Sequence, residues 1–375
     1  MKKCSVGVVV AIATALYGNV VDKGKIEGYV RFGLENQDQR GNISDIALGG
    51  LLKYSTFVIP DFSAGIGFYT VQGQGKRDNI GIPFYDNDNQ NYSLLGELYL
   101  EGTFANATIV LGRQVLDTPF ADSDDVGMVP NLFEAYTLTN RDLQDTTLIF
   151  SHITKMAGVD APNASKFTKV NGSDGVQVAG ALYEGLTNIT LSGWYYHAND
   201  LADMVYLEGD YEGKYSAGSY QLGLQYALQD YNNGDKANIY GVVAEISHEA
   251  SGLSLRGAYN KINSKGTAAA NNFLGGGPFF TSDEHLTLAE AGVDGKAYMA
   301  GLTYDAGNIG MEGMTLSVQS LHLKGLGAKA DEVDLVMNYN PKERFSLDVI
   351  YSDAKNRIDS AESFKNLRVF ANYRF

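Results

Sequence analysis

The sequence ends with Leu367-Arg368-Val369-Phe370-Ala371-Asn372-Tyr373-Arg374-Phe375, in which apolar and polar side chains alternate. Only Phe370 breaks the alternation, because it is apolar at a polar position. A period of two predicts a β-strand with one apolar face and one polar face. Chain ends in soluble domains usually fray in polar tails, whereas this strand stops on an aromatic residue. Such a strand is typical of closed β-barrels in bacterial outer membranes, where aromatic residues mark the lipid–water interface.

The same alternation recurs along the chain and predicts an all-β transmembrane antiparallel barrel. The eighteen predicted strands start near residues 26, 44, 62, 92, 107, 131, 146, 174, 187, 202, 218, 237, 252, 296, 313, 331, 344 and 364. Sixteen strands are the alternative if the weaker segments 131–139 and 202–211 are misread. Closure leaves no exposed strand edge and pairs every backbone group in lipid.

The connections between the predicted strands alternate in length. The long ones cover residues 73–91, 116–131, 156–172 and 262–295, and short turns lie between them. Short turns on the periplasmic rim and long loops on the extracellular rim are typical of such barrels. Within the longest connection, the glycine-rich segment 271–278 is interpreted as a mobile surface loop.

The N-terminus has the pattern of a signal peptide. Lys2 and Lys3 precede an apolar run over residues 6–15 that is too short to span a bilayer. We expect a presequence over residues 1–18, with cleavage between residues 15 and 20, and one barrel domain over 19–375. Cys4 is the only cysteine and lies in this presequence, so the mature chain can form no disulfide.

The composition suits strands with lipid on one side and water on the other. The chain has 43 Gly, 24 Tyr and 17 Phe, but only 7 Pro. Its net charge is −15, and loss of Lys2 and Lys3 would take it to −17. We therefore expect no nucleic acid as a partner, because nucleic-acid binding needs basic surface.

The connection 116–131 carries four aspartates in a short stretch, at Asp117, Asp122, Asp124 and Asp125. If this connection folds into the barrel, its carboxylates would place negative charge where the lumen is narrowest and the field is focused. The alternative is an ordinary solvated acidic loop.

Parity along the strands also predicts that sixteen charged side chains line the lumen, eleven of them acidic and five basic. The main candidates are Arg31, Glu97, Glu101, Arg256, Asp334, Asp348, Arg368 and Arg374. Arg113 has lipid-facing parity, and we expect its strand to bend inward at the start of the connection 116–131. The alternative is a side chain that reaches to the rim.

No catalytic motif emerges from the sequence. The five histidines, at positions 152, 197, 248, 285 and 322, are dispersed, and no nucleophile–histidine pair can be assembled by parity. Residues 86–97 have oxygen ligands at EF-hand-like spacing but lack the required glycine. We expect no enzyme activity, no cofactor and no metal.

Three stretches resemble the OprD-like outer-membrane porin family. They are the final strand, Gly276-Gly277-Pro278-Phe279-Phe280-Thr281-Ser282, and the segment 111–135, which contains Leu111-Gly112-Arg113-Gln114-Val115-Leu116-Asp117-Thr118-Pro119. The resemblance implies an eighteen-stranded passive channel, often trimeric, with a constriction loop after Thr118-Pro119. It also implies a line of lumen arginines, for which Arg31, Arg256, Arg368 and Arg374 are the candidates.

The sequence thus favours a porin that passes small hydrophilic solutes and ions across the bacterial outer membrane with modest cation preference. The main alternative is a solute-specific channel for amino acids or small carboxylates. An outer-membrane hydrolase or an adhesin is less favoured, and the connection 262–295 alone supports the adhesin. Expected partners are outer-membrane lipid and lipopolysaccharide, the solutes, and further copies in a homotrimer.

Overall fold

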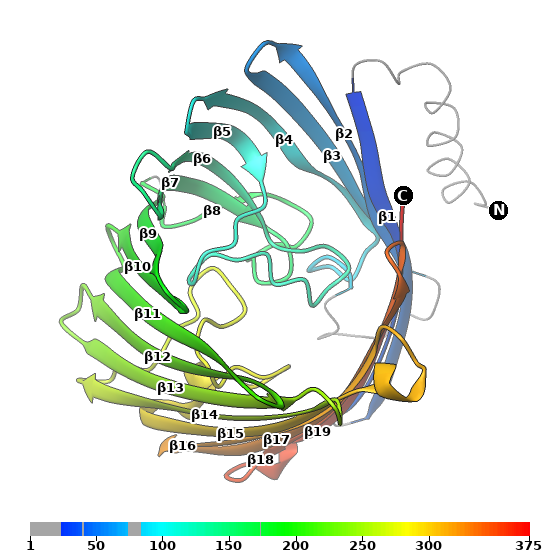
Figure 1. The fold of residues 1–375 in the computed structure, drawn as a ribbon, viewed down its shortest axis with the longest axis vertical. Helices are drawn as coiled ribbons and strands as arrows, with labels where there is room; N and C mark the ends of the chain where they lie inside the picture. Colours follow the sequence, from blue (N-terminus) through cyan, green and yellow to red (C-terminus); the bar gives the residue numbers. More distant parts are fainter. Residues whose placement is uncertain (1–23, 40, 74–83, 173) are drawn as a thin grey trace.

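A computed structural model describes residues 24–39, 41–73, 84–172 and 174–375. The predicted presequence 1–18 and part of the predicted connection 73–91 lie outside these residues. The described residues form one antiparallel sheet that closes on itself (Figure 1). It closes because β1 (Gly24–Asp38) pairs both with β2 (Asn42–Ile59) and with β19 (Phe364–Arg374).

The remaining strands follow in chain order and pair with their sequence neighbours. They are β3 (Phe62–Gly73), β4 (Tyr92–Phe104), β5 (Ala107–Gln114), β6 (Leu132–Asn140), β7 (Thr146–Ala157), β8 (Thr168–Lys169), β9 (Val176–Leu186), β10 (Ile189–Ala198), β11 (Ala202–Tyr215), β12 (Gly218–Tyr231), β13 (Lys236–His248), β14 (Leu253–Lys265), β15 (Val293–Asp305), β16 (Met314–Leu326), β17 (Ala328–Lys342) and β18 (Phe345–Asn356).

The barrel wall has eighteen strands, as the sequence predicts. The two-residue β8 pairs only with the end of β7, and β7 pairs directly with β9, so β8 is not part of the wall. Every predicted strand start lies within three residues of an observed one. The weaker segments 131–139 and 202–211 are the strands β6 and β11, so the sixteen-strand alternative is wrong.

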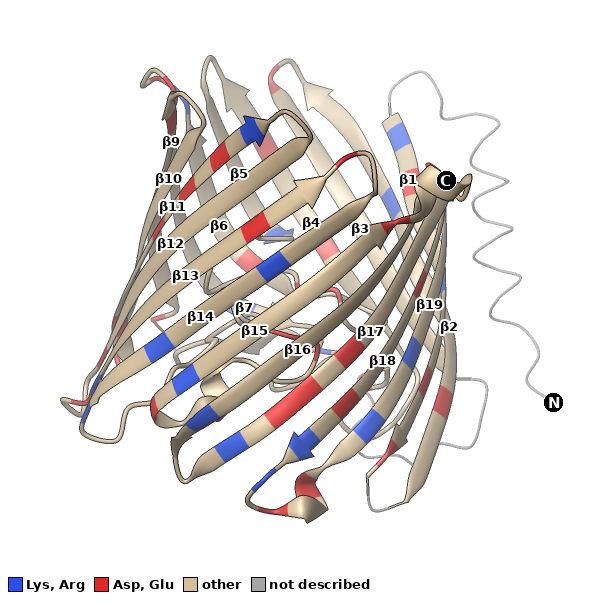
Figure 2. Cartoon of the chain, turned by 60° about the horizontal axis from the view of Figure 1, so that its bottom comes forward, with Lys and Arg blue, Asp and Glu red and all other residues tan. Residues whose placement is uncertain are grey.

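Along each strand, side chains alternate between the outer and the inner face of the wall. Figure 2 shows the strands running obliquely around this wall. On β17, Val333 and Leu335 are exposed on the outside, whereas Glu332 and Asp334 are fully buried inside. Phe370, which breaks the alternation of the last strand, faces inward. Its ring packs against Phe84 and lies 4.9 Å from the guanidinium of Arg31.

The interior of the barrel is less polar than parity predicts. Apolar inward side chains, among them Tyr196, Met204 and Ile239, form a cluster with residues of the connections after β5 and β14. A second cluster around Phe84 and Met128 packs against β2 to β4. Both connections therefore have apolar contacts with the inner wall. They lie inside the ring of strands in Figure 1, where they are drawn in cyan and yellow.

Helical structure in the described residues is confined to three single turns of 3-10 helix. These are η1 (Leu288–Ala291), η2 (Ala306–Ile309) and η3 (Ser360–Glu362). In this part of the chain no helix has the length and apolar character needed to cross a membrane.

Candidate functional site

The connection 115–131, which we call loop A, is anchored inside the barrel by an aromatic side chain. Phe120 is fully buried, with its ring edge-to-face with Tyr196, Tyr206 and Phe279. Its carbonyl accepts a hydrogen bond of 3.0 Å from the backbone N–H of Leu274. Loop A is thus joined both to the wall and to the connection 266–292, which we call loop B.

Asp125 of loop A forms a bidentate ion pair with Arg31 of β1. Both guanidinium N–H groups lie 2.6 Å from the two carboxylate oxygens. Arg31 also donates to the carbonyl of Gly127 and to Asn372, each at 2.7 Å. Its side chain is only 5% exposed, whereas that of Asp125 is 48% exposed. The pair fixes loop A to the wall and neutralises one of the predicted loop charges.

Two other aspartates of loop A are partly buried between loops. The Oδ1 atom of Asp122 accepts a 3.2 Å hydrogen bond from the N–H of Gly276, and burial raises the pKa of this carboxyl. Burial and the nearby Asp160 raise the pKa of Asp124 to about 8. At neutral pH loop A therefore carries less negative charge than its sequence predicts.

Asp117, at the start of loop A, has a local structural role. Its Oδ1 atom accepts hydrogen bonds from the backbone N–H of Ser123 at 3.2 Å and from the Ser123 hydroxyl at 2.7 Å. These bonds close the loop segment that carries Phe120 and Asp122. Asp117 therefore stabilises the turn that presents the other loop residues.

Loop B is not the mobile surface loop that the sequence suggested at 271–278. The carbonyl of Asn271 accepts a 2.6 Å hydrogen bond from Gln229 of β12, and Phe279 is buried. Glycines favour surface turns, but here they allow close approach: a Cβ on Gly276 would lie 2.3 Å from the Asp124 carboxyl carbon. The inward fold of this connection removes the observation that supported an adhesin.

Loop B presents an Asp283-Glu284-His285 sequence to the inner wall. Glu284 forms an ion pair with Arg368 of β19. The carboxylate of Glu332 accepts the backbone N–H groups of His285 and Leu286 at 3.1 and 2.7 Å. Burial, with a smaller contribution from Arg368, lowers the pKa of His285 to about 4. His285 is therefore neutral at physiological pH and adds no positive charge.

Three carboxylates meet where loop B touches β17. The ligand atoms of Asp283, Glu332 and Asp334 lie within 4.8 Å of one another. Neither oxygen of Asp334 has a hydrogen-bond partner in the described structure. Burial and Asp334 raise the pKa of Asp283 to about 9. Oxygen ligands at this spacing could hold a hard divalent cation such as Ca²⁺, which the sequence did not predict.

Loops A and B, together with Asp160 of the connection after β7 and Gln319 of the wall, line an acidic cavity of about 420 Å³. Its lining includes five carboxylic side chains and no lysine or arginine among the described residues. The five are Asp124, Asp160, Asp283, Glu284 and Glu290. Because Glu284 is paired with Arg368 and the pKa values of Asp124 and Asp283 are raised, such a lining favours positively charged or hydrogen-bond-donating solutes over anions only modestly at neutral pH.

The other predicted lumen residues are distributed around the wall. Glu97 is buried, with Lys53 at 2.5 Å and the Tyr69 hydroxyl at 3.1 Å. Arg256 donates to the carbonyl of Phe280 at 3.2 Å and lies 3.9 Å from Glu245. Three further residues do not join loops A and B: Glu101 and Asp348 are half-buried, and Arg374 is exposed.

Arg31 and Arg368 both lie close to the ring of Phe370. Their guanidinium carbons lie 4.9 and 5.7 Å from the centre of its ring. However, each arginine is paired with a loop carboxylate: Arg31 with Asp125, and Arg368 with Glu284. The predicted line of four arginines is thus reduced to two neutralised ones, with Arg256 and Arg374 elsewhere.

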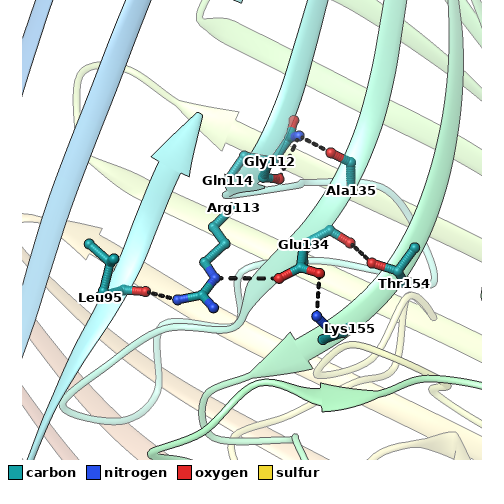
Figure 3. Close-up of polar contacts among 8 residues, drawn as sticks. All are labelled: Leu95, Gly112, Arg113, Gln114, Glu134, Ala135, Thr154 and Lys155. Carbon is teal, nitrogen blue, oxygen red and sulfur yellow. Dashed lines mark hydrogen bonds and ion pairs between the residues drawn. The ribbon is translucent and has the colours of Figure 1, made fainter. Parts of the chain in front are cut away.

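Arg113 turns inward, as the bend at the end of β5 allows. Gly112 has a φ of +124°, a conformation that side chains rarely adopt, and it interrupts the strand alternation. The guanidinium donates to the Leu95 carbonyl at 2.9 Å and lies 3.4 Å from Glu134, as Figure 3 shows. It also stacks on Phe167, which packs against the inner cluster.

Sequence reasoning missed the residues supplied by loop B and by the connection after β7. Asp160, Asp283 and Glu284 lie in long connections without periodicity, so parity gave them no orientation. The sequence feature that could have pointed to these residues is the acidic pair Asp283-Glu284, close to the Gly-Gly-Pro-Phe-Phe stretch.

Comparisons with known proteins agree with this architecture. The family model described as outer membrane porin, OprD family, matches residues 63–373. The structure is similar to the crystal structure of OpdK from Pseudomonas aeruginosa with vanillate, with a TM-score of 0.80 and 16% identity over 94% of this chain and 98% of that one.

Two further solved structures have the same fold. A BenF-like porin from Pseudomonas fluorescens has a TM-score of 0.81 and 13% identity, and the match covers 94% of this chain and 99% of that one. OccAB4 from Acinetobacter baumannii has a TM-score of 0.79 and 15% identity over 94% and 98% of the two chains. No curated protein sequence gives a significant match.

Proposed function

The chain belongs to the OprD family of outer-membrane porins, and from this premise we propose that loops A and B form the constriction of a diffusion channel with modest cation preference. As a family member it is a channel for small solutes in the bacterial outer membrane, and porins are not enzymes. The observation that carries the proposal is the acidic cavity between the loops, lined by five carboxylic side chains without lysine or arginine.

The alternative is a solute-specific channel for amino acids or small carboxylates, and the carboxylate form of it can be compared with the structure. OpdK was crystallised with vanillate, an aromatic carboxylate. A carboxylate needs unpaired cations along its path, and here Arg31 and Arg368 already face Asp125 and Glu284. The ion pairs therefore favour a passage that selects weakly for positive charge.

The proposal is tested by reversal potentials of the purified chain in planar bilayers under a salt gradient. We expect potassium to be more permeant than chloride, and arginine to reduce the single-channel current more than vanillate does. Glu284→Gln should lower the permeability ratio about twofold, because it removes a unit negative charge from the cavity lining and leaves Arg368 without its counter-charge, a change worth roughly 0.5 kcal/mol when screened by water.

Glu312→Gln is the matched control, because Glu312 is exposed in the turn before β16, at the opposite rim. It should leave the ratio unchanged. Strong current block by vanillate with little effect of arginine would instead support the carboxylate-specific alternative.

Cation preference should also rise with pH. The carboxyls of Asp124 and Asp283 have pKa values raised to about 8 and about 9, so both are mostly protonated at about pH 6 and mostly ionised at about pH 10. Ionisation adds up to two negative charges to the cavity. Because the folded-state pKa values exceed the unfolded ones, the stability that these carboxyls give the native loops is greatest at low pH, falls as the pH rises above the unfolded pKa, and is lost above the folded pKa values of about 8 and about 9.

Reversal potentials measured between these two pH values test this expectation. The double variant Asp124→Asn/Asp283→Asn should flatten the pH dependence while leaving the ratio near pH 6 almost unchanged. A wild-type ratio that does not change with pH would contradict the assignment of these two carboxyls to the ion path.

A further inference from the structure

Four lysines form a continuous row on the outside of the barrel. Lys261 of β14 is directly opposite Lys296 of β15, which is opposite Lys324 of β16, which is opposite Lys329 of β17. They appear as a diagonal row of blue positions near the long-loop ends of these strands in Figure 2. We call these four residues the lysine ladder.

Parity and burial place the ladder on the outer face. Lys261 lies between the buried residues Asn260 and Ile262, and Lys296 precedes the buried Ala297. None of the four is itself buried, and Lys324 and Lys329 are exposed. Their side chains therefore project toward the surroundings of the barrel.

The ladder is electrostatically unfavourable within the chain alone. Like charges directly opposite on neighbouring strands, with Cβ atoms about 4.5–5.5 Å apart, destabilise a sheet. No ion pair in the described residues joins any of the four to a carboxylate. Lys324 has one compensating contact, with the ring of Tyr298 at 5.4 Å. Four such charges in a row indicate an anion supplied from outside the chain.

The ladder has defined ends. Beyond Lys329, Asp331 of the same strand pairs with His322 and Arg357, both at 2.5 Å. On the other side, the position opposite Lys261 on β13 is Tyr240. The row of four lysines thus spans four neighbouring strands, over a width of about 14 Å given the usual 4.7–4.9 Å strand spacing.

An aromatic layer gives the depth of the ladder in the membrane. Tyr259 and Tyr298 lie two residues closer to the middle of their strands, with ring centres 4.9 Å apart. Tyrosines at this level form the interfacial girdle of outer-membrane barrels. Two residues of a tilted strand add about 5 Å along the membrane normal, which places the ammonium groups among the lipid headgroups. The long loops mark this side as the extracellular one.

We propose that the lysine ladder binds the phosphate groups of lipopolysaccharide in the outer leaflet. The occupant follows from charge complementarity, since phosphate is the anion that membrane lipids present at this depth. The proposal uses the outer-membrane location of the chain and is independent of its ion preference. Loss of lipid binding is therefore distinguishable from loss of conduction.

The test compares binding of purified lipopolysaccharide to the full chain in zwitterionic detergent. The variant Lys261→Gln/Lys296→Gln/Lys324→Gln/Lys329→Gln should bind at least about tenfold more weakly than wild type, because each lysine near an anionic surface contributes to attraction. The control Lys25→Gln/Lys214→Gln/Lys342→Gln/Arg344→Gln removes four charges near the opposite rim and should bind like wild type. Arginines at the four ladder positions should retain binding.

Thermal unfolding supplies a second readout. The difference in melting temperature between wild type and the ladder variant should change sign when lipopolysaccharide is added. Without lipopolysaccharide, the glutamine ladder variant should melt at the same temperature as wild type or higher, because the repulsion is gone. With lipopolysaccharide, wild type should melt higher. With dephosphorylated lipopolysaccharide, wild type should no longer melt higher than the ladder variant. Millimolar inorganic phosphate should not raise the melting temperature of wild type in the way that lipopolysaccharide does. Equal binding by wild type and the ladder variant, or equal loss in the control, would overturn the proposal.

Discussion

Leu335→Arg should lower the free energy of unfolding of the barrel by about 2–4 kcal/mol, because a charge on the lipid face near the midplane must leave water. Leu335 is 51% exposed on the outside of β17, in the middle of that strand. The measurement is urea unfolding in lipid vesicles, followed by the loss of the heat-modifiable folded band.

The matched control lies on the inner face of the same strand. Parity alone suggests Asp334→Arg, but the structure buries Asp334 completely beside Asp283 and Glu332, so an arginine there would not fit. Asn338 is a better position, because it is only half-buried and lies toward the short-turn rim. Asn338→Arg should change the unfolding free energy much less. Equal losses in the two variants would mean that the assignment of faces on β17 is wrong.

The wall was predictable because its information is local. Strand starts and faces follow from a period of two, which any few consecutive residues display. Phe370 is the apolar exception in the last strand, but the alternation still places its position correctly on the inner face. Its neighbours Phe84 and Arg31 explain why an apolar ring is kept there.

The site was less predictable because its contacts join residues far apart in the sequence. Asp125 was a candidate from the sequence, but its partner Arg31 is 94 residues away, so its neutralisation could not be anticipated. Phe120 meets Phe279 only because two irregular connections fold into one lumen. The raised pKa of Asp124 depends in the same way on Asp160, which lies in a third connection. Periodicity orients strand residues, but it gives no orientation to loop residues.

Asp125→Asn should shift the ion preference of the channel toward anions by about twofold or more, because it leaves the buried guanidinium of Arg31 without its counter-charge. Arg31 keeps its bonds to Asn372 and Gly127, so the arginine itself should stay in place. Loop A loses a charge-assisted hydrogen bond whose acceptor is half exposed, worth about 1–2 kcal/mol. Single-channel recordings should therefore show more current fluctuations as well as a lower cation-to-anion permeability ratio.

Removing the other partner should have the opposite effect on selectivity. Arg31→Gln leaves the half-exposed carboxylate of Asp125 ionised and unpaired, so the cation-to-anion ratio should rise. In the double variant Arg31→Gln/Asp125→Asn the two charge changes cancel, and the ratio should return close to that of wild type. The coupling between the two substitutions isolates the contribution of this ion pair from general effects on the loop. If both single variants shift the ratio in the same direction, loop mobility rather than the pair's charge controls selectivity.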